Sequence, residues 1–355
     1  MVRSGLAVAL LCALGAGACD EGDPAPATGG SFDLLSEWGF FRGDLADLRP
    51  VSGVLLVEPA APLWSDGAVK SRYISVPRGS HVGLRDREEW DFPDGSVVVK
   101  NFGFLLDERE PQGPRRLVET RLLVREAGVW KPLVYMWNED QSDAVKKVAG
   151  AEVIIDRVDA SGQPIAQPYL VPNLAQCASC HERSDVSRLL GVTTPQLNRT
   201  VTRQGRQLNQ LDWLAAQGIF GDAEVLPESW ERFEDPYGDG PLQARARSWL
   251  HANCAHCHEP GGDAGSTGLV LTAWEPEGSR RLGLCKRPAA SGNGAGGLEF
   301  DIVPGDPDAS IMPYRIGSTV PDVRMPELLN LIPDPRAVEL VRGWIAAMEP
   351  GGCEP

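Results

Sequence analysis

Two pentapeptides constrain this 355-residue chain more than any other feature: Cys177-Ala178-Ser179-Cys180-His181 and Cys254-Ala255-His256-Cys257-His258. Each is a C-x-x-C-H run, the spacing that attaches a c-type haem. The two thiols add to the vinyl groups of the porphyrin, and the histidine that follows ligates the iron. The sequence therefore predicts two covalently bound haem c groups, with these residues as attachment points and proximal iron ligands: Cys177, Cys180, His181, Cys254, Cys257 and His258.

Zinc is the alternative to haem. Two distant C-x-x-C pairs also describe a structural zinc site with four thiolate ligands. Such a site does not require a histidine directly after each pair, yet His181 and His258 stand there in a chain with only five histidines. We therefore prefer haem, and expect metal analysis to separate the two hypotheses.

The N-terminus has the pattern of an export signal. Arg3 supplies a positive charge, an apolar run follows over residues 6–14, and small residues extend to Ala18. The apolar run is too short to span a bilayer. Residues 1–18 are therefore predicted to be a signal peptide, which the haem hypothesis requires because bacteria attach haem c outside the cytoplasm.

The residues after the signal leave two forms of export open. Ala16-Gly17-Ala18 suits ordinary signal peptidase, whereas Cys19 resembles a lipoprotein acceptor. We favour lipidation of Cys19, because an unpaired cysteine at a mature N-terminus otherwise has no purpose. Residues 19–31, rich in Gly, Pro and Ala, are predicted to be a flexible tether. The expected location is the periplasm or the cell surface, with or without a lipid anchor in the membrane.

Two cysteines remain for a disulfide. Cys12 leaves with the signal, and the motifs and Cys19 account for five more of the eight cysteines. In an oxidising compartment we expect Cys285 and Cys353 to pair with each other. The alternative is two free buried thiols.

The fold class predicted is α+β with several domains. Residues 32–170 hold short apolar runs between turn residues, which favours a β-sandwich-like domain. The best hairpin joins residues 119–124 to 130–137 near Ala127-Gly128, with Thr120, Leu122 and Val124 on one face. Residues 171–240 form a first haem-binding region, and residues 241–355 are expected to be mainly α, like a class I cytochrome c domain.

Two helices are predicted within the last region. Residues 244–251 lead into the second motif. Asp334 can cap a helix that starts at Pro335, and an apolar stripe follows it.

Met325 is the predicted sixth ligand of the second haem iron. It is one of only five methionines and lies in a Met-Pro pair shortly before the last helix. A carbonyl of Pro304-Gly305 is a candidate partner for the other ring nitrogen of His258. For the first haem the sequence leaves several sixth ligands open, namely His251, Met136, His81 and Met312, or an open iron.

The net charge of −15 argues against nucleic acid and anionic membrane surfaces as partners. It is compatible with docking to a basic redox partner.

The mature chain resembles a family of exported bacterial di-haem c-type cytochromes with an N-terminal β-rich domain, largely uncharacterised. The resemblance lies in the two motifs and in the following stretches: 62–70 (PLWSDGAVK), 92–96 (FPDGS), 119–123 (ETRLL), 196–198 (QLN), 253–258 (NCAHCH) and 303–307 (VPGDP). It implies export, two covalent haems and electron transfer, but no substrate.

The leading functional hypothesis is an electron carrier rather than a catalyst, accepting electrons from a periplasmic dehydrogenase or another cytochrome. One alternative is a di-haem peroxidase-like enzyme with an open first haem. Another is a binding module, in which the β-rich domain localises the haems.

Overall fold

The computed structural model describes residues 25–221, 230–289 and 292–353. The predicted signal peptide, Cys19 and the first part of the predicted tether lie outside these residues.

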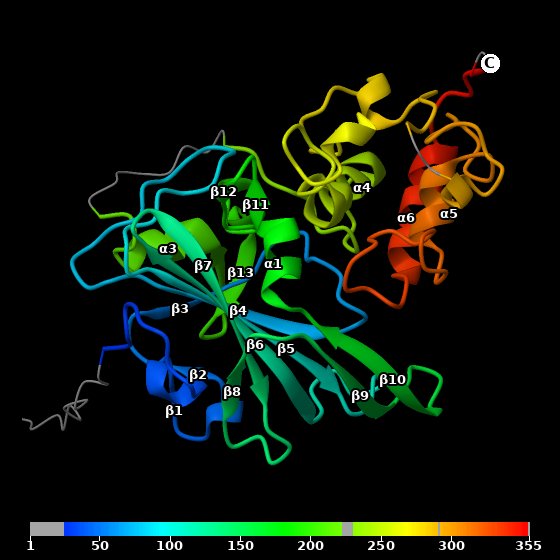
Figure 1. Cartoon of the computed structure of the whole chain (residues 1–355). Helices are drawn as coiled ribbons and strands as arrows, with labels where there is room; N and C mark the ends of the chain where they lie inside the picture. The colour runs from blue at the N-terminus through cyan, green and yellow to red at the C-terminus, as the bar shows by residue number, and fades with distance from the viewer. Residues whose placement is uncertain (1–24, 222–229, 290–291, 354–355) are drawn as a thin grey trace, which may run out of the picture.

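One six-stranded antiparallel sheet organises the first half of the molecule (Figure 1). Its strands are neighbours in chain order, so each connects to the next locally. The apolar runs predicted at 54–57, 73–76 and 97–100 fall on this sheet, whereas the run at 153–155 lies in a separate two-stranded sheet. The strands of the main sheet are β3 (Val54–Val57), β4 (Val69–Ser75), β5 (Val97–Leu105), β6 (Arg115–Glu126), β7 (Val129–Trp137) and β8 (Ala144–Lys147).

The hairpin predicted around Ala127-Gly128 is confirmed, because it joins β6 to β7. Ala127 and Gly128 have φ of 50° and 74°, the left-handed conformation that a tight two-residue hairpin turn needs. Thr120, Leu122 and Val124 share one face as predicted, since Thr120 accepts a hydrogen bond from the Trp137 ring nitrogen at 3.0 Å and Trp137 lies in the same core as Leu122 and Val124. Leu122 and Val124 belong to the apolar core on one face of the sheet.

The prediction of a β-sandwich is wrong, because among the described residues no second large sheet covers the first. One face packs against the 3-10 turn η1 (Leu35–Trp38) and the small pair β1 (Phe41–Arg42) and β2 (Arg49–Pro50). The opposite face packs against helices α2 (Thr194–Leu197) and α3 (Gln210–Ala216), and against the hairpin of β9 and β10. Strand alternation reports which face is buried, but not what buries it.

The remaining strands form separate two-stranded sheets. They are β9 (Ala151–Val158) with β10 (Pro164–Val171), β11 (Glu182–Arg183) with β12 (Val186–Ser187), and β13 (Thr200–Arg203) with β14 (Arg206–Asn209).

The expectation of a mainly α C-terminal region is also wrong, and the described chain is mostly β with few helices. The α-helices described from residue 230 onward are α4 (Leu242–Leu250), α5 (Ile311–Ile316) and α6 (Pro335–Ala346). Between α4 and α5 the described residues form the π-helical turn η3 (His251–Ala255), loops and the short 3-10 turns η4 (Gly265–Thr267), η5 (Arg280–Leu282) and η6 (Gly292–Ala295). Glycine and proline are frequent in this stretch, and both disfavour helices.

The two helices predicted individually are confirmed as α4 and α6. The Asp334 side chain accepts hydrogen bonds from the backbone of Arg336 and Ala337, at 3.2 and 3.4 Å, and so caps α6. The two helices pack against each other around a core that includes Trp249 and Trp344. No described helix is both long enough and apolar enough to cross a bilayer.

The predicted disulfide is present in the structure. Cys285 and Cys353 are joined at 2.05 Å, with their Cα atoms 5.1 Å apart. The bond ties the end of the described chain to the loop that follows η5.

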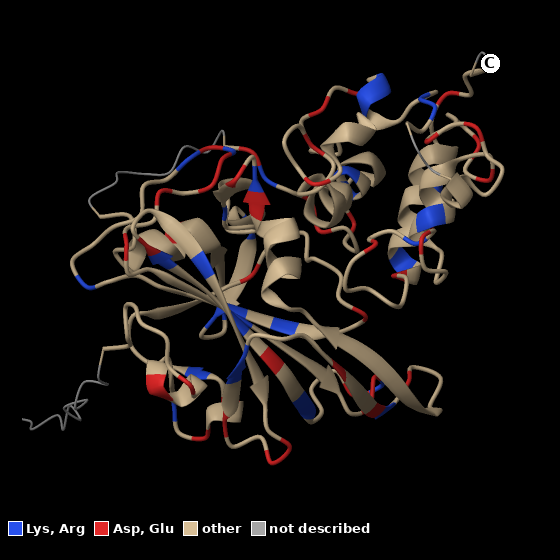
Figure 2. Cartoon of the chain, in the orientation of Figure 1, with Lys and Arg blue, Asp and Glu red and all other residues tan. Residues whose placement is uncertain are grey.

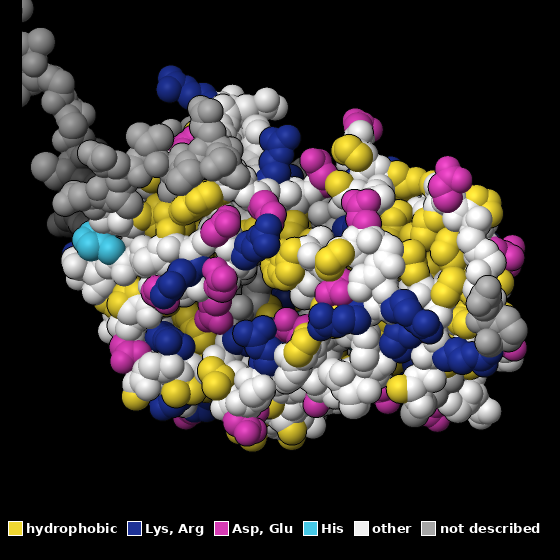
Figure 3. Space-filling view, turned by 90° about the horizontal axis from the view of Figure 1, so that it is seen from above, with side chains coloured by type: hydrophobic (Ala, Val, Ile, Leu, Met, Phe, Trp, Pro, Cys, Tyr) yellow, Lys and Arg dark blue, Asp and Glu magenta, His cyan; other side chains and the backbone are white. Residues whose placement is uncertain are grey.

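Acidic and basic side chains are mixed over both halves of the molecule (Figure 2). On the face seen from above, hydrophobic side chains gather over the C-terminal region, with charges of both signs among them (Figure 3). The net charge of −15 is therefore not concentrated in one acidic patch on this face.

Candidate functional site

Both C-x-x-C-H motifs line one cavity of 780 Å³ between the sheet and the C-terminal region. Its volume lies within the roughly 300–1,000 Å³ that is usual for cofactor pockets. All four motif cysteines, together with His181 and His258, are among the lining residues. The fold thus brings together two motifs that are far apart in the sequence.

The first motif lies on helix α1 (Leu174–His181), directly after strand β10. Asn173 caps this helix, because its side chain accepts from the Gln176 backbone at 2.9 Å while Gln176 accepts from the Asn173 backbone at 3.0 Å. Cys177 is buried beside the apolar cluster that contains Phe102 and Phe104. The cap and this packing hold the motif over the sheet.

The second motif follows α4 through a π-helical turn, η3 (His251–Ala255). The Cys254 carbonyl accepts from the backbone N–H of Cys257 at 3.2 Å and of His258 at 2.9 Å. The buried Asn253 side chain donates to the Trp249 carbonyl at 3.0 Å. These bonds close the motif into a compact turn at the end of α4.

Arg188 links the two motifs directly. The Arg188 backbone N–H donates to the His181 carbonyl at 2.7 Å. Its guanidinium donates to the His256 carbonyl at 2.5 Å and forms an ion pair with Glu259. The sequence offered no signal for this role, because Arg188 lies outside both motifs.

His181 and His258, the two predicted iron ligands, both carry a proton on Nδ1. His181 Nδ1 lies 3.0 Å from the Arg188 carbonyl, which can only accept, so Nδ1 carries the proton and Nε2 is free. His258 Nδ1 lies 3.2 Å from Thr267 Oγ1. Since the Thr267 hydroxyl donates to the Ala264 carbonyl at 2.7 Å, its oxygen accepts from His258.

Burial reinforces this state of the two rings, because it lowers the pKa of both His181 and His258 to about 4. Neutral imidazoles with a bonded Nδ1–H are typical of metal-ligating histidines. The predicted carbonyl partner in Pro304-Gly305 is wrong, since Thr267 takes that place.

His251, one candidate for the sixth ligand of the first haem, has the opposite tautomer. Its Nδ1 accepts from the Ala273 backbone N–H at 3.3 Å, so the proton of the neutral ring is on Nε2. The ring lies between Phe233 and Trp274, with centroid distances of 4.7 and 4.6 Å. This environment suits a structural histidine that stays neutral.

We expect the cost of protonating His251 in the folded state to lower the free energy of unfolding as the pH falls. Burial, and then the charges of His256, Arg188 and Arg247, lower the pKa of His251 to about 3. Its contribution to stability is therefore present above its unfolded pKa of about 6.5 and is lost as the pH falls toward about 3.

Urea denaturation of the wild type and of His251→Gln, at pH values from about 7 to about 4, measures this contribution. As the pH falls over this range, the unfolding free energy of the wild type should decrease relative to that of His251→Gln by roughly 3 kcal/mol. Parallel losses in the two proteins would show that His251 is not the titrating group.

The other candidates for a sixth ligand differ in whether they line the cavity. Met325 and Met312 line the cavity, and both pack with the core of the C-terminal region. Met136 does not line it and packs with the cluster around Phe104, while His81 is bonded to the Gly218 carbonyl at 3.1 Å outside it. Met325 packs with the same cluster as Cys254 of the second motif, and its role as an iron ligand stays a prediction.

One group of side chains in the described residues could hold a metal ion directly. The ligand atoms of Cys180, His256 and Cys257 lie within 4.8 Å of one another. The contact with the Cys257 thiol lowers the pKa of Cys180 and raises that of Cys257. Cys177 and Cys254 are not in this group, so the four-thiolate zinc site considered as the alternative to haem is not assembled.

The loop 62–68, part of the stretch that resembles the di-haem family, connects the sheet to the C-terminal region. The Trp64 backbone N–H donates to the Asn253 side chain at 2.7 Å, next to the second motif. The Trp64 ring nitrogen donates to the Ile332 carbonyl at 2.7 Å. The buried Asp66 carboxylate accepts from the backbone of Leu331 and Ile332, each at 2.9 Å.

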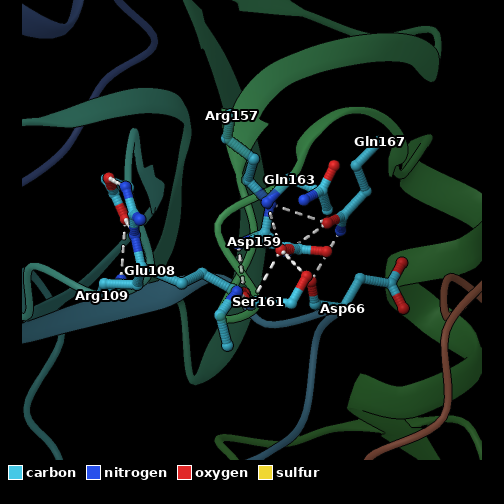
Figure 4. A network of polar contacts seen from close by, with 10 residues as sticks. Asp66, Glu108, Arg109, Arg157, Asp159, Ser161, Gln163 and Gln167 are labelled. Atoms are coloured by element: carbon cyan, nitrogen blue, oxygen red, sulfur yellow. Dashed lines mark hydrogen bonds and ion pairs between the residues drawn. The ribbon is translucent and has the colours of Figure 1, made fainter.

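A polar network holds the Asp66 end of this loop (Figure 4). Gln167 donates to the Asp66 carbonyl at 2.8 Å and accepts from Arg157 Nε at 2.9 Å. Arg157 is in turn paired with Glu108. The loop therefore has a structural role: it fixes the C-terminal region, with the second motif, against the sheet and the first motif.

Comparisons of this chain with protein-family models, with curated proteins and with solved structures found no match.

Proposed function

We propose that the chain is an exported di-haem c-type cytochrome that carries electrons. The observation that carries the proposal is the meeting of two C-x-x-C-H motifs at one cavity, each with a neutral histidine whose Nε2 is free. Cys177, Cys180, Cys254 and Cys257 would attach the porphyrins. When bound, haem supplies the one-electron chemistry.

The chain's own residues would hold the two redox centres at a fixed separation. Arg188 couples the first motif to the second through hydrogen bonds, and the loop 62–68 holds Asn253 beside Cys254. Apolar side chains such as Leu250 and Leu271 exclude water from the cavity wall. The electron donor we propose is a periplasmic dehydrogenase or another cytochrome.

Two measurements on protein matured with a working cytochrome assembly apparatus test the proposal. A pyridine haemochrome assay with mass spectrometry should find two haems per chain. A redox titration followed by electron paramagnetic resonance should then report two iron centres. Zinc without porphyrin would contradict the proposal and would point to the group of Cys180, His256 and Cys257.

Replacing Met325 by alanine should remove the weak charge-transfer band of a methionine-ligated ferric haem. It should also lower one midpoint potential, because a thioether ligand raises the potential. We expect this midpoint potential to fall by at least about 59 mV, which is a tenfold change in the one-electron equilibrium. Met348→Ala is the matched control, since Met348 packs with the same core but does not line the cavity. An unchanged band in Met325→Ala would make Met325 a packing residue.

A peroxidase-like activity of the first haem is the second candidate function. Among the described residues, the histidines and methionines that line the cavity outside the motifs are His251, Met312 and Met325. His251 has its proton on Nε2, and both methionines pack with the C-terminal core. This arrangement favours an open sixth position at the first haem. A high-spin ferric signal with peroxide turnover would support it, and two low-spin centres would contradict it.

A further inference from the structure

Three cations lie side by side on the face of the sheet toward the cavity. The strand register places Arg72 directly opposite Lys100, and Lys100 directly opposite Arg121. All three line the cavity, on the side of the first motif. Figure 2 shows basic segments on these central strands (blue). Like charges directly opposite each other destabilise a sheet, so this row needs an explanation.

The surrounding charges do not balance the row. Arg121 forms a two-pronged ion pair with the buried Glu119, at 2.5 and 2.9 Å. Within the described residues, Arg72 and Lys100 have no ion pair, and Lys100 lies 4.8 Å from the centre of the Phe102 ring. Glu119 is therefore the one carboxylate among the described residues that pairs with the row, and it pairs with Arg121 alone. The three side chains are half-buried, and a partly desolvated charge without a partner is unfavourable.

The ionisation of the row is disturbed accordingly. Burial, and then the charges of Arg72 and Arg121, lower the pKa of Lys100 well below its usual value. Burial lowers the pKa of Arg72 to about 10. The other cation nearby, Lys70, does not line the cavity, and Asp66 lies within its electrostatic reach. An anion in the cavity would relieve this repulsion.

We propose that the row of Arg72, Lys100 and Arg121 is a carboxylate-binding site that receives the two propionates of the first haem. This inference rests on the proposed function. One haem carries two propionate carboxylates, and guanidinium groups bind carboxylates in a two-pronged geometry, which suits Arg72 because it has no ion pair among the described residues. Arg121 is also close enough to the Cys177 sulfur to affect its ionisation, so the row and the first attachment point share one end of the cavity.

The test is a redox titration of the full holoprotein with Arg72→Gln and, separately, Lys100→Met, which keeps the apolar contact with Phe102. Removing a cation beside the propionates favours the ferric state. We expect one midpoint potential to fall by at least about 59 mV, a tenfold change in the one-electron equilibrium, while the other stays in place. Arg72→Lys should keep the potential close to the wild-type value, because lysine keeps the positive charge.

The matched control is Lys147→Gln, which removes an exposed cation from strand β8 of the same sheet and should shift neither potential. Two bound haems with wild-type potentials in both cavity variants would overturn this inference alone. A wild-type protein without haem would overturn the proposed function as well. Acetate that perturbs one haem spectrum in the wild type, but not in Arg72→Gln, would show that the row binds a free carboxylate and overturn the propionate assignment.

Discussion

Replacing Cys254 and Cys257 together by alanine is expected to halve the haem content of the purified protein. Each C-x-x-C-H motif would attach its own porphyrin, so loss of one pair of thiols leaves the other pair intact. The same result is expected for Cys177→Ala with Cys180→Ala. A pyridine haemochrome assay and the intact mass of the chain measure the effect.

The matched control is Cys285→Ala with Cys353→Ala, which also removes two sulfurs but breaks the disulfide instead. It should keep the full haem content. A single metal shared between the motifs would behave differently, because either motif variant would then lose all of it. That outcome would indicate one bridging metal ion instead of two haems.

Replacing Asp66 by alanine is expected to lower the free energy of unfolding by about 3 kcal/mol. Its carboxylate accepts from two backbone N–H groups of the C-terminal region, those of Leu331 and Ile332. Asp66 is 1% exposed, and it has a positive φ of 52° that alanine adopts poorly. Asp66→Asn should have a smaller effect, because asparagine keeps an acceptor oxygen and tolerates this backbone.

Urea denaturation of the holoprotein measures the loss, with Glu139→Ala as the control in an exposed loop of the same sheet. The two haem potentials report whether the C-terminal region has moved relative to the sheet. Wild-type stability in Asp66→Ala would mean that water replaces the carboxylate without loss, and that the loop 62–68 does not hold the two halves together.

Local signals predicted the local elements well. The alternating runs of the predicted hairpin located β6 and β7, and the turn at Ala127-Gly128 joined the correct pair. The cap at Asp334 located the start of α6. These predictions succeeded because dihedral preferences, capping and periodic burial depend on neighbouring residues in the chain.

The predictions that failed concerned how elements combine. The sequence did not reveal that one sheet would be covered by short helices and a hairpin instead of a second sheet. It also suggested a mainly α C-terminal region, although the segment between α4 and α5 forms loops and 3-10 turns. Two good helix signals say nothing about the long glycine- and proline-rich chain between them.

The sequence by itself determined the chemistry proposed for this protein, because the spacing of cysteines and histidines within five residues is a local property. It also identified the two cysteines of the disulfide by elimination. Only the tertiary structure decided that the motifs share one cavity, which histidines have Nε2 free, and that Arg72, Lys100 and Arg121 form one row. These features depend on strand register and on hydrogen bonds between distant segments. Neither can be predicted from the spacing of residues along the chain.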